Sequence, residues 1–219
     1  MADKMELIWG SGSAPCWRAM IVLEEKGLQG YKSDMISFGK QEHKGEKVLK
    51  LNPRGQVPVF KDGDVVINES LAICDYLERK VPEKCSLYPK DLAQAAKVLQ
   101  RVQEANSNVQ KITIYDYMFF GGQSKDKMGP EELQKRKDAA ANEIKRWEEY
   151  LEKEGKGKFL CGDSFTMADV VFFPFVAFWF RSGLNGEKHA VLQEYYNMLK
   201  DRKSIAASWP PHWKEGPGQ

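Results

Sequence analysis

Apolar and polar positions alternate in short periods over the first third of the chain and in longer periods after it. Four apolar runs have the length and composition of β-strands: 5–9, 31–38, 57–60 and 65–68. Two segments carry apolar residues at helical spacing: 15–26 and 71–79. Pro15 and Gly27 are usual boundaries for the first helix, and Ser70 is a candidate N-cap for the second. Asp62-Gly63 predicts a hairpin that makes the last two strands antiparallel.

The order of these elements is strand, helix, strand, a polar segment around 41–51, hairpin and helix. This order predicts a small thioredoxin-like α/β domain over residues 1–82, in which the first two strands are parallel. Residues 83–90 follow Pro82 and include Pro89, and we expect them to form a linker.

From residue 91 onward the pattern predicts helices without strands, so we expect an all-helical domain over residues 91–219. Four segments have the helical spacing: 92–120, 130–154, 166–181 and 190–199. The first has its apolar stripe at Leu92, Ala95, Leu99 and Val102. The third begins with Thr166 and Asp169 at the spacing of a capping box, and it is apolar almost all round, which predicts a buried helix. The tail from Ser208 is expected to be irregular.

Composition narrows the choice of partners. The 33 basic and 31 acidic residues are interspersed and give a net charge of +2, which argues against nucleic acid or an anionic membrane as partner. No apolar run is long enough to span a bilayer, and the first residues lack the basic and apolar regions of a signal peptide. We therefore expect a cytoplasmic protein.

The four cysteines, Cys16, Cys74, Cys85 and Cys161, are widely spaced, with no C-x-x-C motif and no histidine pair at ligand spacing. This pattern predicts no metal site. We expect reduced thiols, three of them in apolar surroundings.

The segment Ser13-Ala-Pro-Cys16 lies where the first strand gives way to the first helix. Thioredoxin-like proteins place a C-x-P-C motif there, and the helix stabilises the thiolate of its first cysteine. Here serine holds that position. Its hydroxyl is able to donate a hydrogen bond to a sulfur anion supplied by a ligand, or Ser13 is only the N-cap of the helix. Cys16 shares a helical face with apolar residues and should point inward.

Three motifs extend this comparison over the whole chain: Asn52-Pro-x-Gly-Gln-Val-Pro58, Asn68-Glu-Ser70 and Phe165-Thr-Met-Ala-Asp169. In this order and spacing the sequence resembles the cytosolic glutathione transferases, which combine a thioredoxin-like domain with an all-helical one. The tract 9–28 and the ending Ser208-Trp-Pro-Pro-His-Trp213 are most similar to the rho class known from fish and molluscs.

The resemblance implies a glutathione site made of Ser13, His43, Lys44, Gln56, Val57, Pro58, Glu69 and Ser70. Ser13 would be the catalytic hydroxyl that faces the glutathione sulfur. The pair His43 and Lys44 would contact the glycine carboxylate, and Gln56 and Val57 the cysteinyl-glycine part. Glu69 and Ser70 would contact the γ-glutamyl end. These residue types suit two carboxylates and one ammonium group. Each also has a structural interpretation, as a solvated loop residue, a turn residue or a helix start.

Further implications concern the second substrate and the assembly. Tyr115, Met118 and Phe119 are candidates to line a hydrophobic electrophile site in the helical domain, although such aromatic residues also serve as core. The resemblance implies a cis Val57-Pro58 peptide, and a homodimer whose contact involves helices near Leu71 to Leu77 and Leu92 to Val109. Glutathione would be a co-substrate, with no other cofactor.

Departures from other classes narrow the chemistry. The alpha, mu and pi classes use a tyrosine near the N-terminus, whereas the first tyrosine here is Tyr31. The omega class has cysteine at the position of Ser13, and the zeta class has Ser-Ser-Cys where this chain has Ser13-Ala-Pro. Thiol transfer and zeta-type isomerisation are therefore disfavoured.

The leading hypothesis is an enzyme that conjugates the glutathione thiol to hydrophobic electrophiles, a detoxification reaction. One alternative is a non-catalytic glutathione-binding member of the family, and another is a glutathione-dependent peroxidase. Disulfide exchange through Cys16 is a further alternative, which its expected burial disfavours.

Overall fold

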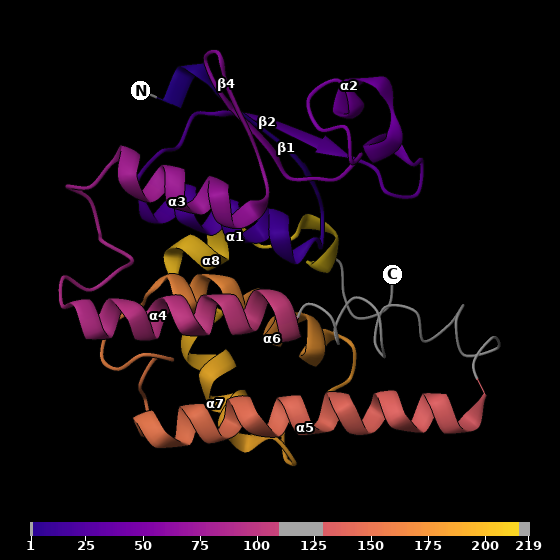
Figure 1. Ribbon diagram of the computed structural model, residues 1–219, viewed down its shortest axis with the longest axis vertical. Coiled ribbons are helices and arrows are strands. Elements are labelled where there is room, and N and C mark those ends of the chain that lie inside the picture. The colour runs from indigo at the N-terminus through magenta and orange to yellow at the C-terminus, as the bar shows by residue number, and fades with distance from the viewer. Residues whose placement is uncertain (1, 110–128, 215–219) are drawn as a thin grey trace. The chain divides into compact units, whose positions relative to one another are not determined.

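The computed structural model describes residues 2–109 and 129–214 (Figure 1). The chain groups into two compact units, one of Met1–Ser86 with Asp201–Gln219 and one of Leu87–Lys200. The sequence pattern assigns 201–219 to the helical domain. In the structure the described part of this segment instead joins the N-terminal unit, because α8 (Lys203–Ala207) packs against α1 (Ala14–Glu25).

The N-terminal unit is built on a four-stranded mixed sheet with the order β2-β1-β3-β4. Its strands are β1 (Met5–Gly10), β2 (Lys32–Ile36), β3 (Val59–Asp62) and β4 (Val65–Asn68). The first two strands are parallel, and β3 is antiparallel to both β1 and β4. The predicted thioredoxin-like order is confirmed. Ile8, Ile36, Val48 and Val59 form a buried cluster that joins three strands to the short helix α2 (Glu46–Leu49).

Helix α1 and helix α3 (Ser70–Lys80) pack against each other (Figure 1). Both bury apolar side chains, Ile21, Val22 and Leu23 from α1 and Ile73 and Leu77 from α3. Three 3-10 helices complete this unit: η1 (Ala2–Lys4), η2 (Glu42–Lys44) and η6 (Pro211–Trp213).

The described part of the second unit contains α4 (Leu92–Glu104), α5 (Pro130–Glu154), α6 (Met167–Arg181) and α7 (Ala190–Leu199). Helix α6 packs against α4 and α7, and α5 also packs against α7. Every residue of 167–177 is buried, as the all-round apolar pattern predicts. The all-helical character is confirmed, since these described residues form no strand beyond one isolated bridge between Phe159 and Gly162.

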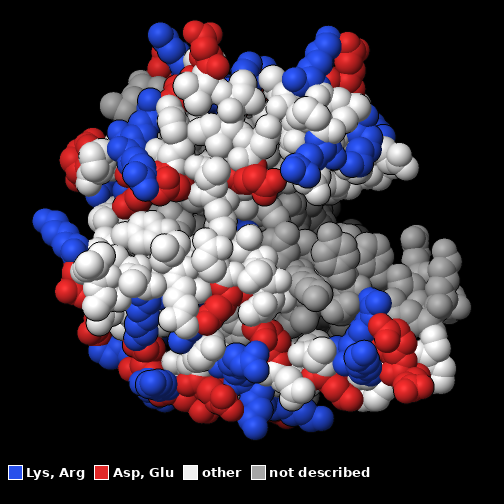
Figure 2. Space-filling model, viewed as in Figure 1, with Lys and Arg blue, Asp and Glu red and all other residues white. Residues whose placement is uncertain are grey.

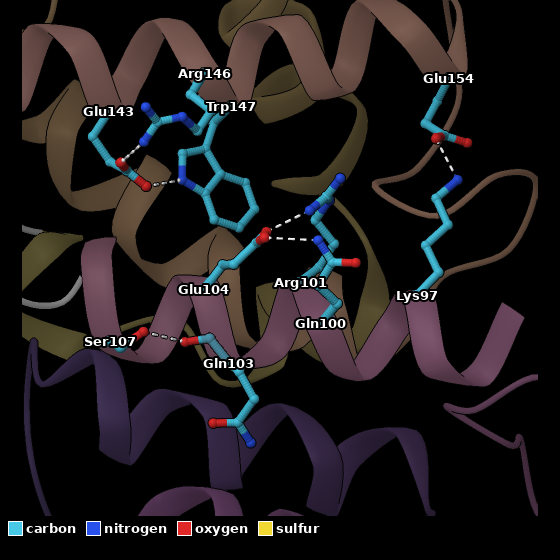
Figure 3. Close-up of polar contacts among 10 residues, drawn as sticks. All are labelled: Lys97, Gln100, Arg101, Gln103, Glu104, Ser107, Glu143, Arg146, Trp147 and Glu154. Carbon is cyan, nitrogen blue, oxygen red and sulfur yellow. Dashed lines mark hydrogen bonds and ion pairs between the residues drawn. The ribbon is translucent and has the colours of Figure 1, made fainter. Parts of the chain in front are cut away.

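The structure corrects the predicted stripe of α4. Leu92 is 83% exposed and Leu99 is 47% exposed, and Val98, which is not in the predicted stripe, is buried. Val102 is buried as predicted. The α-helix ends at Glu104, and a π-helix follows over Ala105–Val109. The π-helical residues include two asparagines and Ser107, which are poor helix formers, and the Ser107 hydroxyl donates to the Gln103 carbonyl at 2.7 Å (Figure 3).

Polar side chains bridge α4 and α5 (Figure 3). Lys97 of α4 forms an ion pair with Glu154 of α5. Arg101 pairs with Glu104, and its guanidinium lies 3.5 Å from the ring centre of Tyr150. The Lys97–Glu154 ion pair and the Arg101–Tyr150 contact therefore join α4 to the C-terminal end of α5.

Charged side chains of both signs are interspersed over the face of the molecule in Figure 2. No large area of one sign is visible there, as the composition predicts. None of the described helices is long and apolar enough to cross a membrane.

Candidate functional site

The register of the sheet brings four connecting segments to one edge. Gly10, the last residue of β1, pairs with Ile36, the last residue of β2. Val59, the first residue of β3, pairs with Ile8 near the end of β1 and with Asn68 at the end of β4. The segments 11–13, 37–45, 52–58 and 69–70 therefore leave the sheet at the same edge. All candidate residues of the N-terminal unit lie in these four segments.

Ser13 is the N-cap of α1. Its side-chain oxygen accepts a hydrogen bond from the Cys16 amide at 3.4 Å, and its own amide donates to the Gly10 carbonyl at 3.2 Å. The capping interpretation is thus confirmed. Capping also holds the hydroxyl, which is half-buried, at the N-terminal end of the helix. Backbone N–H groups and the helix dipole favour an anion at this place.

The segment 52–58 is held by its own side chains. Asn52 is buried, its amide nitrogen donates to the Gln56 carbonyl at 2.8 Å, and its side-chain oxygen accepts from the Arg54 amide at 3.1 Å. The Val57-Pro58 peptide is cis, as predicted. Gln56 is exposed, Val57 is half-buried and Pro58 is buried.

The 3-10 helix η2 contacts the segment 52–58 through Lys44. The Lys44 ammonium donates to the Arg54 carbonyl at 3.1 Å. Gly55 has a φ of +59°, and a Cβ on it would lie 2.8 Å from the Lys44 side chain. The lysine side chain therefore packs directly against the Gly55 backbone, where a larger residue would clash with it. The ring of His43 packs at 5.4 Å from that of Phe38. Its Nδ1 is buried and has no hydrogen-bond partner among residues 2–109 and 129–214.

Glu69 and Ser70 begin α3, and here one prediction is wrong. The N-cap is Glu69, with a φ of +69°, and Ser70 is the first helical residue. A positive φ is uncommon for a residue other than glycine, and such backbone strain occurs preferentially at functional sites. Ser70 is buried, and its hydroxyl accepts a hydrogen bond at 3.3 Å from Arg18, which is itself fully buried on α1.

Family models match both halves of the chain: the N-terminal domain of glutathione S-transferases over residues 12–80, and the C-terminal domain over residues 118–208. Glutathione S-transferase A of Pleuronectes platessa is 48% identical over 219 residues, which cover 99% of this chain and 96% of the relative. The chain belongs to the glutathione S-transferase family.

Solved structures agree with this assignment. A glutathione S-transferase from the Antarctic clam Laternula elliptica superposes with a TM-score of 0.84 at 45% identity, covering 97% of this chain and 95% of that one. The glutathione transferase URE2P6 from Phanerochaete chrysosporium, solved with oxidised glutathione, superposes with a TM-score of 0.82 at 25% identity, covering 97% and 98%.

The thiol nearest to Ser13 belongs to Cys16. Cys16 is fully buried, and burial raises its pKa to about 11, against the opposing effect of hydrogen bonds with Ser13 and the Gly10 backbone. The Gly10 amide lies 3.5 Å from the Cys16 sulfur. The expectation that Cys16 points inward is confirmed. Cys74 and Cys161 are buried as well, while Cys85 is exposed.

The predicted electrophile residues Tyr115, Met118 and Phe119 lie outside the described residues. Among residues 2–109 and 129–214, no three His, Cys, Asp or Glu side chains gather in an arrangement that would hold a metal ion.

The structure adds residues that the sequence did not assign to the site. Arg18 lies on the buried face of α1, where an arginine is rare. An arginine among apolar residues at helical spacing could therefore have indicated a buried polar contact from the sequence. Asn52 and Asn68 were recognised only as parts of motifs, and the Asn68 amide donates to the Leu51 carbonyl at 3.0 Å. His212 lies near the Ser11–Ser13 loop, about two hundred residues away in sequence, and no local pattern indicates this contact.

Proposed function

We propose that this chain conjugates the thiol of reduced glutathione to hydrophobic electrophiles, with Ser13 as the catalytic residue. One observation carries the proposal. The sheet register gathers the eight candidate residues at one edge, and the hydroxyl of Ser13 lies there at the N-terminus of α1. The relatives named glutathione S-transferase support the same reaction.

The two ends of glutathione match the groups on either side of this edge. The Lys44 ammonium has three N–H donors and uses one for Arg54, and the neighbouring His43 imidazole is a second nitrogen-bearing side chain, so we assign the glycine carboxylate to them. Gln56, Val57 and Pro58 would bind the cysteinyl-glycine part. At the other end, Ser70 and the N-terminus of α3 suit the γ-glutamyl carboxylate, and Glu69 suits its ammonium.

Ser13 would activate the thiol by donating a hydrogen bond to the sulfur anion. A hydrogen bond to a charged group contributes about 1.5–3 kcal/mol, which lowers a thiol pKa of about 8.5 by about one to two units. The helix N-terminus acts in the same direction. The bound thiol would then ionise near neutral pH and attack an electrophilic carbon held beside it.

Two measurements test this function together. Retention on immobilised glutathione tests binding, and turnover of an aryl halide with glutathione tests conjugation. A non-catalytic glutathione-binding protein would give the first result without the second. A protein that is not retained on immobilised glutathione and does not turn over the aryl halide would contradict the proposal. An alkyl hydroperoxide and a mixed disulfide in the same panel identify the peroxidase and thiol-transfer alternatives.

Finer features belong to the same proposal. We infer a serine-type enzyme of the rho class, which the similarity to a fish and a clam protein supports. Residues 1–82 would bind glutathione and 83–90 would be the linker, and the helical unit that follows would supply the hydrophobic site, with Tyr115, Met118 and Phe119 lining it. Glutathione would be the co-substrate, without a further cofactor, and the enzyme would act as a homodimer. The four unpaired cysteines are compatible with a cytoplasmic location.

A further inference from the structure

The C-terminal segment of the N-terminal unit runs back along α1. Arg202 forms two hydrogen bonds with the Glu25 carboxylate at the end of α1, at 2.6 and 2.8 Å. Ser208 accepts a hydrogen bond from the Trp17 indole at 2.9 Å, in the first turn of the helix. The earlier residue of the segment, Arg202, contacts the end of α1, and the later residue, Ser208, contacts its start. The segment is therefore antiparallel to α1 and leads toward the loop that precedes the helix.

Aromatic packing fixes the last part of this path. Trp17 is buried, with 2% of its surface exposed. Its ring centre lies 5.1 Å from that of Trp209 and 5.5 Å from that of Trp213, both in edge-to-face geometry. Such pairs add stability beyond their buried area and prefer defined orientations. His212 is exposed and immediately precedes Trp213 in the 3-10 turn, so this packing restricts the position of its backbone.

His212 meets the loop that carries Ser13. Its Nδ1 lies 2.6 Å from the Ser11 hydroxyl oxygen, a hydrogen bond between groups far apart in sequence. Gly12 has a φ of +79°, and a Cβ on it would lie 2.8 Å from Cε1 of His212 and 3.4 Å from the Trp213 indole nitrogen. A side chain at residue 12 would therefore require the imidazole to shift, because the imidazole lies against Gly12.

We propose that His212 is a positioning residue for Ser13, acting through its hydrogen bond to Ser11 and its contact with Gly12. This inference rests on the proposed function, because it concerns the hydroxyl that would activate the thiol. The loop between β1 and α1 contains Gly12 at a positive φ, and glycine gives a loop conformational freedom. A contact from outside the loop reduces this freedom. Small displacements of a catalytic group have large effects on rate, and His212 limits the displacement of Ser13.

The test compares Ser11→Ala, His212→Ala and the double variant, with kcat and KM for glutathione measured on an aryl halide. Each single variant should lower kcat roughly 3- to 10-fold, the range expected for one hydrogen bond. The KM for glutathione should change by less than about twofold, because the tripeptide is bound elsewhere. The double variant should be no slower than either single variant, since both remove the same interaction.

Two further variants separate positioning from general stability. His212→Asn keeps a polar atom at the place of Nδ1 and should recover most of the rate, whereas His212→Gln places its amide one bond farther and should not. His189→Ala is the matched control, because His189 of the second unit also uses its Nδ1, 3.1 Å from Glu148. It should keep the wild-type kcat.

A second readout does not depend on turnover. Ultraviolet absorbance of the thiolate, measured against pH, gives the pKa of the bound glutathione thiol, and this pKa should rise in Ser11→Ala and His212→Ala. The proposal is overturned if both variants keep the wild-type kcat and thiol pKa, if their effects multiply in the double variant, or if His212→Asn is as slow as His212→Ala. Wild-type protein that ionises bound glutathione without turning over any electrophile would contradict the proposed function and leave this inference intact.

Discussion

Ser13 and Cys16 lie one helical turn apart and have opposite surroundings. The Ser13 hydroxyl is half-buried at the helix end, while the Cys16 thiol is fully buried beneath it, where burial raises its pKa to about 11. A thiol with this pKa is protonated at neutral pH and is a poor nucleophile. The first turn of α1 thus leaves the Ser13 hydroxyl partly exposed and keeps the Cys16 sulfur buried.

Ser13→Ala should slow turnover by about 10- to 100-fold near neutral pH, while glutathione affinity stays within a few-fold of wild type. The reason is that the hydroxyl stabilises the thiolate, whereas most contacts to the tripeptide lie elsewhere. The deficit should shrink as pH rises above the pKa of free glutathione, because the thiol then ionises without help. Steady-state kinetics over a range of pH measure both effects.

Cys16→Ala is the matched control for this variant, and it should lower the free energy of unfolding more than it lowers kcat. Full activity of Ser13→Ala below neutral pH would reverse the assignment. So would a folded but inactive Cys16→Ala variant.

Among the elements, the start of α6 shows how a local motif is extended by tertiary contacts. Thr166 and Asp169 form the predicted capping box. Asp169 is fully buried and also accepts hydrogen bonds from the Leu160 amide and the Tyr195 hydroxyl, both at 3.0 Å. Burial raises the pKa of this carboxyl, and these hydrogen bonds act in the opposite direction. Asp169 therefore joins the α6 terminus to a loop and to α7.

Asp169→Ala should lower the free energy of unfolding by about 2–4 kcal/mol, because it leaves several buried donors without an acceptor. Urea unfolding measures the change. Asp163→Ala is the control, since Asp163 has 79% of its side chain exposed and its loss should cost less than about 0.5 kcal/mol. A large loss of kcat in Asp169→Ala without a loss of stability would place this residue in the chemistry instead.

At the scale of the whole molecule, exposed apolar side chains are informative about assembly. Leu92 and Leu99 of α4 are 83% and 47% exposed, and Val65 and Val66 of β4 are 44% and 41% exposed. Burying such side chains in a subunit contact is favourable. The exposed leucines lie on one of the helices that the family resemblance assigns to a two-fold contact.

We expect a homodimer, so sedimentation at micromolar concentration should give about twice the chain mass of 25.0 kDa. Leu92→Glu with Leu99→Glu should shift the protein to monomers, because two charges would enter an apolar contact. Met35→Glu changes a residue that is 56% exposed and lies outside the expected contact, and it should leave the dimer intact. Wild-type protein sedimenting as a monomer would end this prediction.

Alkaline pH should destabilise the fold through its buried thiols. Burial raises the pKa of Cys74 to about 12, above the ordinary thiol value of about 8.5. The neutral thiol therefore stabilises the folded state below about pH 8.5, and this contribution is lost as pH rises toward the folded-state pKa. Between about pH 9 and 10, wild type should lose about 1 kcal/mol more of its unfolding free energy than Cys74→Ala does.

Urea unfolding at both pH values measures this difference. Cys85→Ala, which removes an exposed thiol, should keep the wild-type dependence. Parallel curves for wild type and Cys74→Ala would mean that Cys74 does not ionise in this way.

The sequence alone determined most of the strands and helices. Strand and helix periods, the Asp62-Gly63 turn and the proline and glycine boundaries depend on neighbouring residues, so they could be recognised without the fold. The inward orientation of Cys16 followed from the same periodicity. The motifs Asn52–Pro58 and Asn68–Ser70 identified the segments of the candidate site, although the cap of α3 was placed one residue late.

Only the tertiary structure decided what lies beside these segments. The buried Arg18 under Ser70, the π-helical end of α4 and the path of residues 202–213 along α1 all depend on contacts between distant parts of the chain. Leu92 and Leu99 of α4 were wrongly assigned to the buried face for the same reason, since packing partners and not periodicity alone determine which face is buried. His212 reaches the Ser13 loop because an aromatic cluster and an ion pair hold its segment there, and no local pattern contains that information.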